Sequence, residues 1–452
     1  MQVTLQKLTT LLDRHDTADT ACDRLLEQLS TLIKGPNGCE LASSLGRSDV
    51  AVLGRYGFDD ARPERRHLAL RCLHNAMVQA PPVTEMFVNG GLPGRAVELM
   101  TVCRLPSEQL VLELDSLTVT PQSTNADDQF FAARLLIRCS ADPAAGFLPD
   151  FEHGVLAETI NAATALHAST GEIEPTVACT AHLRLILVLA AKYEAQAHHL
   201  LPSMSPILQM FERAPIRNPP LEPPMSLLID CLAALVSHNG PIATSEMPWP
   251  PFNEDKLVNV LSLAIQAYPP EVLETRITPL ASLLFKISQS GPAETKERLR
   301  AHLLPSDQDR TQVLGRGDSL PHRLVSISTE TVSPELKKVM AHLFLELSDG
   351  DPKRLIHNVG FGCGVGLLHS ISTPAPPDDS DTGQSTEGTG EINPVTGQRR
   401  DMETQTSLAE MTDEQKEREA ERLFVLFERL RATGVLNVEN PVGAALRSGR
   451  VE

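Results

Sequence analysis

The chain has 452 residues and a formal charge of −18, with 40 Lys and Arg against 58 Asp and Glu. This acidic balance argues against a general binder of nucleic acid or of an anionic membrane, because both need a positive field. Apolar residues make up 41% of the chain but aromatic residues only 4%, so we expect a soluble protein with a large core of Leu and Ala.

The N-terminal sequence, MQVTLQKLTTLLDRHD, predicts an amphipathic helix and lacks the apolar centre of a signal peptide. No apolar run further along the chain approaches the roughly 18–20 residues that cross a bilayer. The eight cysteines are scattered without a C-x-x-C pair, which argues against zinc and against a redox dithiol. We therefore expect a cytoplasmic protein with reduced thiols, no metal and no cofactor.

Six segments place apolar residues at i, i+3, i+4 and i+7 and are predicted to be helices. They are 65–80, 130–145, 180–195, 225–239, 277–291 and 333–350. Their starts lie 45 to 65 residues apart, close to the ~40–47-residue period of armadillo and HEAT repeats with loop insertions. A helical hairpin of this size cannot bury its own apolar face, so stacked neighbours supply the core. We predict an all-α, armadillo/HEAT-like α-solenoid over 1–371, with an unrelated helical bundle as the alternative.

The composition changes after the predicted solenoid. Residues 372–410 are rich in Ser, Thr, Gly, Asp and Pro, which predicts a disordered acidic linker. Helical periodicity returns over 411–434, and a tail follows at 435–452. One face of this C-terminal helix carries Ala420, Leu423, Phe424, Phe427 and Leu430. The apolar stripe must cover either the last repeats or a partner, and both interpretations stay open.

Several predicted helices carry a cation within otherwise apolar sequence. These cations are Arg71, Arg134, Arg138, Arg184, Lys286, Lys337 and Lys338. For any one of them, the simplest interpretation is a stem that lies along the surface and a head that pairs with a carboxylate. For the set, the alternative is a basic groove that binds an acidic peptide or a terminal carboxylate. Asn75 could hydrogen-bond a bound segment in the same groove or serve only as a local cap.

The motifs that suggest an enzyme fail on spacing. The glycines of 360–366 match no phosphate-binding loop, and we expect a tight connection before a helix at 365–371. The lipase-like sequence GDSL at 317–320 lies in a polar loop without a strand to carry a nucleophile. Because no nucleophile–base or metal-ligand spacing is present, an enzyme is the least favoured class.

Two ordered motifs lie near the C-terminus. Residues 391–397 read EINPVTG, and MTDEQKEREA at 411–420 is followed by FERL at 427–430. This pattern resembles the C-terminal signature of the synembryn family, guanine-nucleotide exchange factors and folding chaperones for heterotrimeric G-protein α subunits. The resemblance is sharp beyond residue 315 and diffuse before it. It implies an armadillo/HEAT superhelix, in agreement with the periodicity.

The resemblance also implies how such a protein acts. A concave groove would take the C-terminal helix of a GDP-bound or nucleotide-free α subunit, promote GDP release and stabilise the nucleotide-free state without covalent chemistry. In this sequence the groove residues would be Arg71, Asn75, Phe130, Arg134, Arg138, Arg184 and Lys286. A second contact with the α subunit would come from Leu423, Phe424, Phe427 and Leu430. We expect a monomer that is recruited to the cell cortex through the α subunit.

The linker differs from that of animal synembryns, which is longer, more acidic and carries kinase sites. Its equivalent here is 378–387, where Ser380 and Thr382 are the candidate phosphorylation positions. The alternative function is an armadillo-type adaptor that binds peptides without exchange activity.

Overall fold

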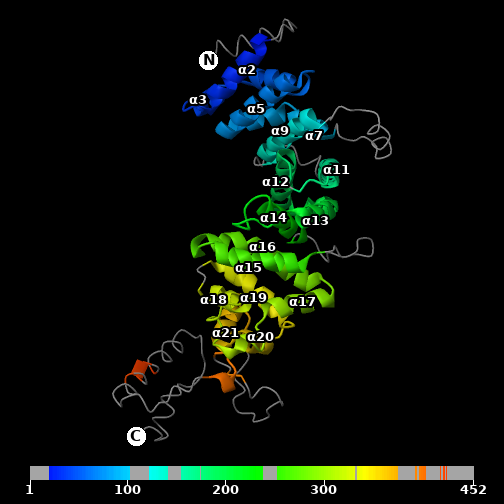
Figure 1. Cartoon of the computed structure of the whole chain (residues 1–452). Coiled ribbons are helices and arrows are strands. Elements are labelled where there is room, and N and C mark those ends of the chain that lie inside the picture. Colours follow the sequence, from blue (N-terminus) through cyan, green and yellow to red (C-terminus); the bar gives the residue numbers. More distant parts are fainter. Residues whose placement is uncertain are drawn as a thin grey trace. The chain divides into compact units, whose positions relative to one another are not determined.

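The computed structural model describes residues 20–101, 122–140, 154–173, 175–237, 252–330, 333–374, 392–393, 396–403, 418, 421–422 and 424. Every regular element among these residues is a helix (Figure 1). The chain forms two compact units, residues 1–398 and 399–452. None of the helices described is long and apolar enough to cross a membrane.

The helices of the first unit have the following bounds. They are α2 (Thr20–Lys34), α3 (Gly38–Ser43), α4 (Arg47–Phe58), α5 (Pro63–Gln79), α6 (Pro81–Asn89), α7 (Leu92–Thr101), α9 (Gln122–Ser140), α11 (Val155–Ser169), α12 (Val177–Lys192), the 3-10 helix η1 (Glu194–Ser203), α13 (Met204–Arg213), α14 (Met225–Ser237), α15 (Glu254–Ala267), α16 (Pro270–Ser290), α17 (Ala293–Leu303), the 3-10 helix η2 (Asp309–Thr311), α18 (Leu320–Glu330), α19 (Pro334–Leu347), α20 (Pro352–Val359) and α21 (Phe361–Ser370).

One continuous row of helices runs through the first unit. In the order α2, α5, α9, α12, α14, α16, α19, α21, each helix packs against the next one in the row (Figure 1). We call this row the ladder. The six segments predicted from periodicity are its members α5, α9, α12, α14, α16 and α19, so the prediction of a repeated helical unit is confirmed.

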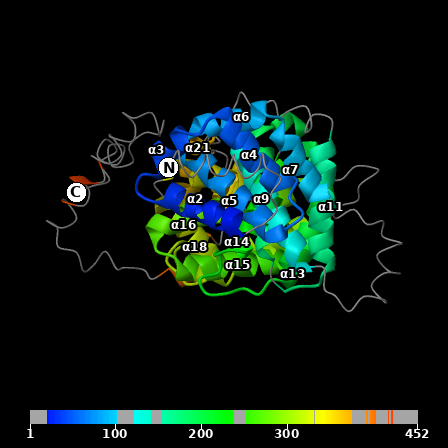
Figure 2. The same cartoon turned by 90° about the horizontal axis from the view of Figure 1, so that it is seen from above.

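The other helices form a second layer beside the ladder. Among them α4, α6, α7, α11 and α13 pack on ladder helices and on one another, and α6, α7, α11 and α13 lie toward the periphery in Figure 2. The number of outer helices between consecutive ladder helices varies. Two are described between α5 and α9, namely α6 and α7, and one, α15, is described between α14 and α16. This variable number of outer helices contributes to the irregular spacing of the predicted segments. The two stacked layers are those of an armadillo/HEAT-like solenoid.

Local sequence fixes where the ladder helices begin. The first helical residue of α5 is Pro63, where the missing N–H removes no intrahelical bond. The Thr176 hydroxyl oxygen caps α12 by accepting from the Cys179 amide at 3.2 Å. Pro334 begins α19, which Ser333 caps by accepting from the Leu336 amide at 3.4 Å. Each of these caps satisfies a backbone donor that the first turn leaves free.

The core is aliphatic, as the composition predicts. It consists of two clusters of buried side chains, one over α2 to α6 that reaches Leu135 and Cys139 of α9, and one from α7 to α21. The largest fully buried side chains include Phe87, Phe211 and Phe344, with Leu and Ile making up the rest. The described cysteines are free thiols, and all of them except Cys39 are buried.

The glycines at 360–366 belong mainly to a helix. Helix α21 begins at Phe361, four residues before the predicted start, so the expected glycine-rich connection is wrong. Only Gly360 caps it, with φ +83°. A Cβ on Gly364 would lie 2.9 Å from Cγ1 of Ile356 in α20. The glycine therefore permits close packing of two helices.

Part of the predicted linker is attached to the first unit. The Leu314 amide donates to the Thr396 carbonyl at 3.1 Å, and the Gln398 side-chain amide donates to the Thr311 carbonyl at 3.0 Å. We call Asn393 and residues 396–398 the docked turn. The first unit thus extends to Gln398, beyond the predicted boundary at 371, where the Thr396 carbonyl of the INPVTG motif and the neighbouring Gln398 side chain find partners.

A buried arginine holds this turn. Arg310 is 4% exposed, and its two terminal nitrogens donate to the Gly397 carbonyl at 3.1 Å and to the Asn358 carbonyl at 3.2 Å. Gly397 has φ +67°, and a Cβ there would lie 2.4 Å from Cδ1 of Leu314. Only glycine therefore fits this position without strain.

The second unit is described at residues 399–403, 418, 421–422 and 424. Arg400–Met402 form a 3-10 turn, and Arg418, Glu421, Arg422 and Phe424 are helical. These four residues lie within the helix predicted at 411–434. Phe424 is 39% exposed. Leu423, Phe427 and Leu430, like the candidate phosphorylation positions Ser380 and Thr382, lie outside the described residues.

Candidate partner-binding site

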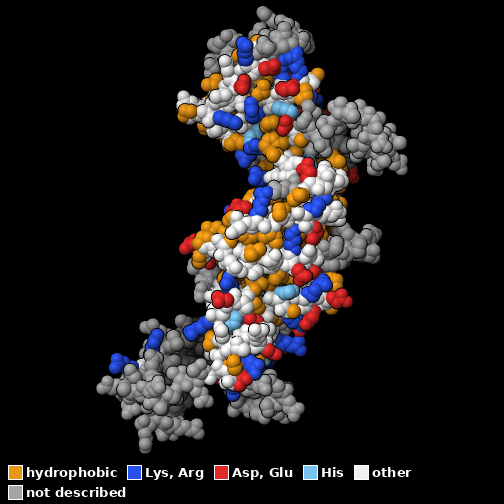
Figure 3. Space-filling view, viewed as in Figure 1, with side chains coloured by type: hydrophobic (Ala, Val, Ile, Leu, Met, Phe, Trp, Pro, Cys, Tyr) orange, Lys and Arg blue, Asp and Glu red, His pale blue; other side chains and the backbone are white. Residues whose placement is uncertain are grey.

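Most of the predicted groove residues lie on three consecutive ladder helices. Helix α5 carries Arg71 and Asn75, α9 carries Phe130, Arg134 and Arg138, and α12 carries Arg184. Helix α9 packs against both α5 and α12. We call these six residues the basic ladder face. Figure 3 shows Lys and Arg side chains recurring over this part of the first unit.

Three arginines of the face, Arg134, Arg138 and Arg184, are close enough to repel one another. Burial, and then the positive charges of Arg184 and Arg138, lower the pKa of Arg134 below its usual value. The guanidinium carbon of Arg134 lies 5.1 Å from the centroid of the Phe130 ring, one helical turn away. The face therefore concentrates positive charge beside an aromatic surface.

Two further residues, His74 and Lys34, lie close to these arginines and were not predicted from the sequence. Burial, and then the charge of Arg134, lower the pKa of His74 on α5 to about 4, and Arg138 and Lys34 act in the same direction. Lys34 is the last residue of α2, the ladder helix that precedes α5. Because Lys34 ends an amphipathic helix, the sequence could have indicated it as a candidate. No sequence feature near His74 indicates that residue.

The four arginines of the face form no ion pair with a carboxylate in the part of the chain that is described. Other arginines of the same region behave differently. On α5, the Arg65 Nε lies 2.7 Å from Asp23, and an Arg66 nitrogen lies 2.6 Å from Asp128. In a chain with 58 acidic residues, carboxylates are abundant. The absence of carboxylate partners therefore favours a surface that binds an anionic partner over one whose arginines pair with carboxylates of the same chain.

Two donors of the face are buried without a partner. Arg71 Nε and Asn75 Nδ2 have no hydrogen bond, although both atoms are shielded from solvent. A buried donor left unpaired costs about 1–3 kcal/mol, and its presence in a folded protein calls for an explanation. The two residues are one helical turn apart on α5.

Lys286 is not brought into this cluster. It lies on α16, and α14 packs between α12 and α16 in the ladder. Its Nζ lies 5.5 Å from the Phe285 ring centroid and 3.4 Å from Oε1 of Gln289. Its role in partner binding stays a prediction.

The geometry around the GDSL sequence favours no catalysis. Ser319 donates to Oδ1 of Asp309 at 2.5 Å. The His322 ring contacts the Asp309 carbonyl at 2.9 Å and accepts from the Gly315 amide at 3.1 Å. Both side chains are thus engaged in holding a loop. Within the described ranges, no group of three or more His, Cys, Asp and Glu residues could hold a metal ion.

A family model described as guanine nucleotide exchange factor synembryn matches residues 25–450. The chain belongs to this family, Ric8. The match begins within α2 and covers the rest of the ladder, the docked turn and the helical residues of the second unit. The resemblance seen in the C-terminal motifs is therefore confirmed as family membership.

Individual relatives match a shorter region. A synembryn-like chaperone of Schizosaccharomyces pombe is 32% identical over 170 residues, which cover 35% of this chain and 32% of that protein. Chaperone Ric-8A of Xenopus laevis is 32% identical over 167 residues, covering 35% of this chain and 30% of that protein. The chain thus matches about a third of the length of these synembryn relatives.

Solved structures give weaker similarity. Kap121p is 11% identical with a TM-score of 0.25, over 82% of this chain and 41% of Kap121p. An engineered protein is 17% identical with a TM-score of 0.33, over 82% of this chain and 95% of that protein. Scores this low carry no argument, so the fold rests on the helix packing described above.

Proposed function

We propose that this chain is an exchange factor and folding chaperone for α subunits of heterotrimeric G proteins, and that the basic ladder face binds the C-terminal helix of the α subunit. Membership of the synembryn family supports the activity. The observation that carries the site is the face itself, with four arginines that have no ion pair among the described residues and two buried donors without partners. The proposed site of action is the cytoplasm, with recruitment to the cell cortex through the α subunit.

The end of a helix is a suitable ligand for this face. The last turn of an α-helix leaves four carbonyl oxygens unpaired and carries a partial negative charge, to which a terminal carboxylate adds a full one. Guanidinium groups bind such carboxylates through two parallel hydrogen bonds. Arg71 and Asn75 supply further donors, and Phe130 supplies an apolar surface for a side chain of the ligand.

Exchange would follow from linkage between two equilibria. A protein that binds the nucleotide-free α subunit preferentially lowers the affinity of the α subunit for nucleotide. By linkage, nucleotide lowers the affinity of the α subunit for that protein by the same factor. A coupling of about 1–3 kcal/mol corresponds to roughly 5–150-fold. The chaperone role has the same origin, because binding to an otherwise unstable state stabilises it by mass action.

The test is release of labelled GDP from a purified α subunit. We expect the wild-type chain to accelerate GDP release. The double variant Arg134→Glu/Arg138→Glu should give an acceleration at least about tenfold smaller, because each charge reversal removes a charged hydrogen bond. The melting temperature should not fall, because neither arginine has a carboxylate partner among the described residues and their mutual repulsion disappears.

The matched control is Arg316→Glu/Lys338→Glu, which reverses two exposed cations outside the face. This control should accelerate release as the wild type does. Binding of the α subunit without accelerated release would make the chain an adaptor. Equal loss in both double variants would remove the basic ladder face from the site.

A further inference from the structure

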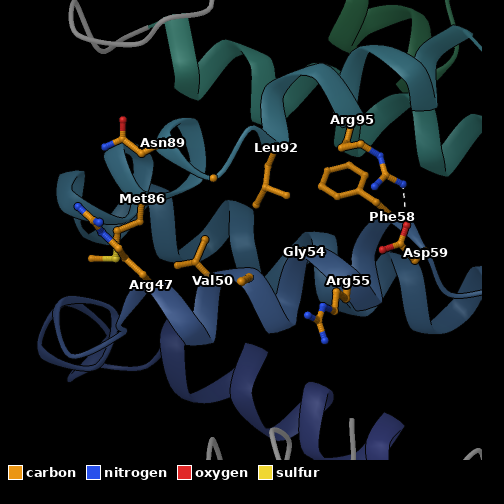
Figure 4. A pocket seen from close by; sticks show the side chains of 12 residues that line it. Arg47, Val50, Gly54, Arg55, Phe58, Asp59, Met86, Asn89, Leu92 and Arg95 are labelled. Carbon is orange, nitrogen blue, oxygen red and sulfur yellow. Dashed lines mark hydrogen bonds and ion pairs between the residues drawn. The ribbon is translucent and has the colours of Figure 1, made fainter. Parts of the chain in front are cut away.

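The second layer contains a groove that the proposed function does not use. Helices α4, α6 and α7 enclose a cavity of about 400 Å³ (Figure 4). Its lining is apolar in the middle, where Val50 and Phe58 of α4 meet Met86 of α6 and Leu92 of α7. Cavities of about 300–1,000 Å³ with an apolar lining and a few polar groups are typical of binding sites. We call this cavity the α4–α6–α7 groove.

A glycine keeps the middle of the groove open. Gly54 lies within α4, where glycine costs about 0.5–1 kcal/mol relative to alanine. A Cβ at this position would lie 3.0 Å from both terminal methyl groups of Leu92. Figure 4 shows Gly54 across from Leu92, between Val50 and Phe58. Any larger side chain would fill the groove beneath Leu92.

The rim of the groove is positively charged. Arg47 and Arg55 are exposed and form no ion pair among the described residues. At the other end, Arg95 is already paired, because its Nη2 lies 2.6 Å from Asp59 and its Nε lies 3.0 Å from Glu98. Its guanidinium carbon lies 6.0 Å from the Phe58 ring centroid. The side chains of Arg47 and Arg95 lie at opposite ends of the groove in Figure 4. The groove thus combines an apolar floor with two exposed cations, Arg47 and Arg55, that have no carboxylate partner among the described residues.

We propose that the α4–α6–α7 groove binds an acidic amphipathic segment of a protein partner. Large apolar side chains of the segment lie on the floor between Val50 and Leu92, and its carboxylates pair with Arg47 and Arg55. Charge complementarity selects this occupant, because Arg47 and Arg55 are exposed cations without carboxylate partners among the described residues. The proposal is independent of the exchange activity, since none of these residues belongs to the basic ladder face.

The test is fluorescence anisotropy of a labelled peptide of about 14 residues, or four helical turns, with Leu and Phe at i, i+3, i+4 and i+7 and Glu elsewhere. It is titrated with the full chain carrying Arg134→Glu/Arg138→Glu, so that the basic ladder face does not contribute. We expect binding that weakens with salt. Adding Arg47→Glu/Arg55→Glu should weaken it at least about tenfold, as expected for loss of charged hydrogen bonds.

Three controls make the result decisive. Arg316→Glu/Lys338→Glu, in the same background, should leave the affinity unchanged. A peptide with Lys in place of every Glu should not bind. Gly54→Leu should abolish peptide binding, because its side chain fills the floor of the groove. It can also unfold α4. If its melting temperature falls, the comparison of Arg47→Glu/Arg55→Glu with the control pair decides the result.

The proposal is overturned if the Glu peptide does not bind, if the Lys peptide binds equally well, or if Arg47→Glu/Arg55→Glu has no more effect than the control pair. Sedimentation with phosphatidylserine vesicles tests whether the groove binds an anionic membrane surface instead of a peptide. Capture of the chain by vesicles in an Arg47- and Arg55-dependent manner, without peptide binding, would assign the groove to a membrane surface and contradict a peptide partner.

Discussion

Among the described residues, buried polar side-chain atoms without a hydrogen bond occur in three places. They are Arg71 and Asn75 on α5, Arg213 on α13, and a pair of histidines. His167 of α11 and His182 of α12 form a pair inside the array, with ring centroids 5.3 Å apart and both Nε2 atoms unpaired. Burial lowers the pKa of His167 to about 4, and burial followed by the charge of His167 lowers that of His182 to about 3. Both rings are therefore neutral near pH 7 and serve packing.

This pair predicts how stability depends on pH. Both folded-state pKa values lie below the usual value of 6.5, so the unfolded chain binds more protons than the folded chain between pH 6.5 and about 4. The free energy of unfolding should therefore decrease as the pH falls through this window. At about 1.4 kcal/mol per pKa unit, His167 accounts for about 3 kcal/mol of the decrease. His167→Leu should reduce the slope, as measured by urea unfolding at pH 7, 6, 5 and 4.5.

The matched control is Leu187→Ala, which removes a half-buried residue of α12 that packs on the core and binds no proton. This variant should keep the wild-type slope. If His167→Leu and the wild type lose stability in parallel as the pH falls, the buried pair does not govern the acid sensitivity.

At the scale of the element, the sequence predicts the ladder better than the outer layer. Ladder helices bury side chains against helices on several sides, so their apolar pattern is strong; α12, for example, buries Leu183, Leu185, Ile186 and Leu189. Helix α17 buries only Thr295, Leu299 and Leu303, and its remaining positions are charged residues, a histidine and two alanines. Periodicity alone cannot separate such a helix from a polar loop.

The candidate site was predictable in part for the same reason. A cation within an apolar ladder helix must lie at the edge of the buried stripe, so Arg134, Arg138 and Arg184 share one surface. The sequence does not reveal how far apart two ladder helices are, and Lys286 was therefore placed with them although α14 intervenes. Lys34 and His74 were missed because their position depends on the packing of α2 and α5.

The docked turn allows a prediction about a single element. Gly397→Ala places a Cβ 2.4 Å from Leu314 Cδ1 at a residue with φ +67°. We expect the turn to be displaced at a cost of about 1–3 kcal/mol. The Leu314 amide, which donates to Thr396, should then lose protection from hydrogen exchange.

Gly350→Ala is the matched control for this substitution. Gly350 also has a positive φ, +70°, but a Cβ there meets nothing within 4 Å. This variant should be destabilised by backbone strain alone. Hydrogen exchange at the Leu314 amide should stay as in the wild type. Equal behaviour of the two variants would mean that contact with Leu314 does not hold the turn.

At the scale of the whole molecule, the docked turn decides where the second unit is attached. Gln398 is held by Thr311, and the chain enters the second unit at Arg399. A segment tethered to a fixed point acts at a high effective concentration on a partner that is already bound elsewhere on the chain. The proposed contact by Leu423, Phe424, Phe427 and Leu430 would gain from this arrangement.

Truncation after Glu403 tests that second contact, because it removes the C-terminal helix and keeps the docked turn. Burial of one Leu or Phe side chain contributes about 1.5–3 kcal/mol, so loss of a contact built from four of them should weaken α-subunit binding by at least about tenfold. If the helix binds the partner, the truncated chain melts as the wild type does, binds the α subunit more weakly and loses exchange activity. The substitution Phe424→Glu, at a residue 39% exposed, should reproduce part of this loss. A sharp drop in melting temperature with unchanged affinity per folded molecule would instead show that the apolar stripe extends the core of the chain itself.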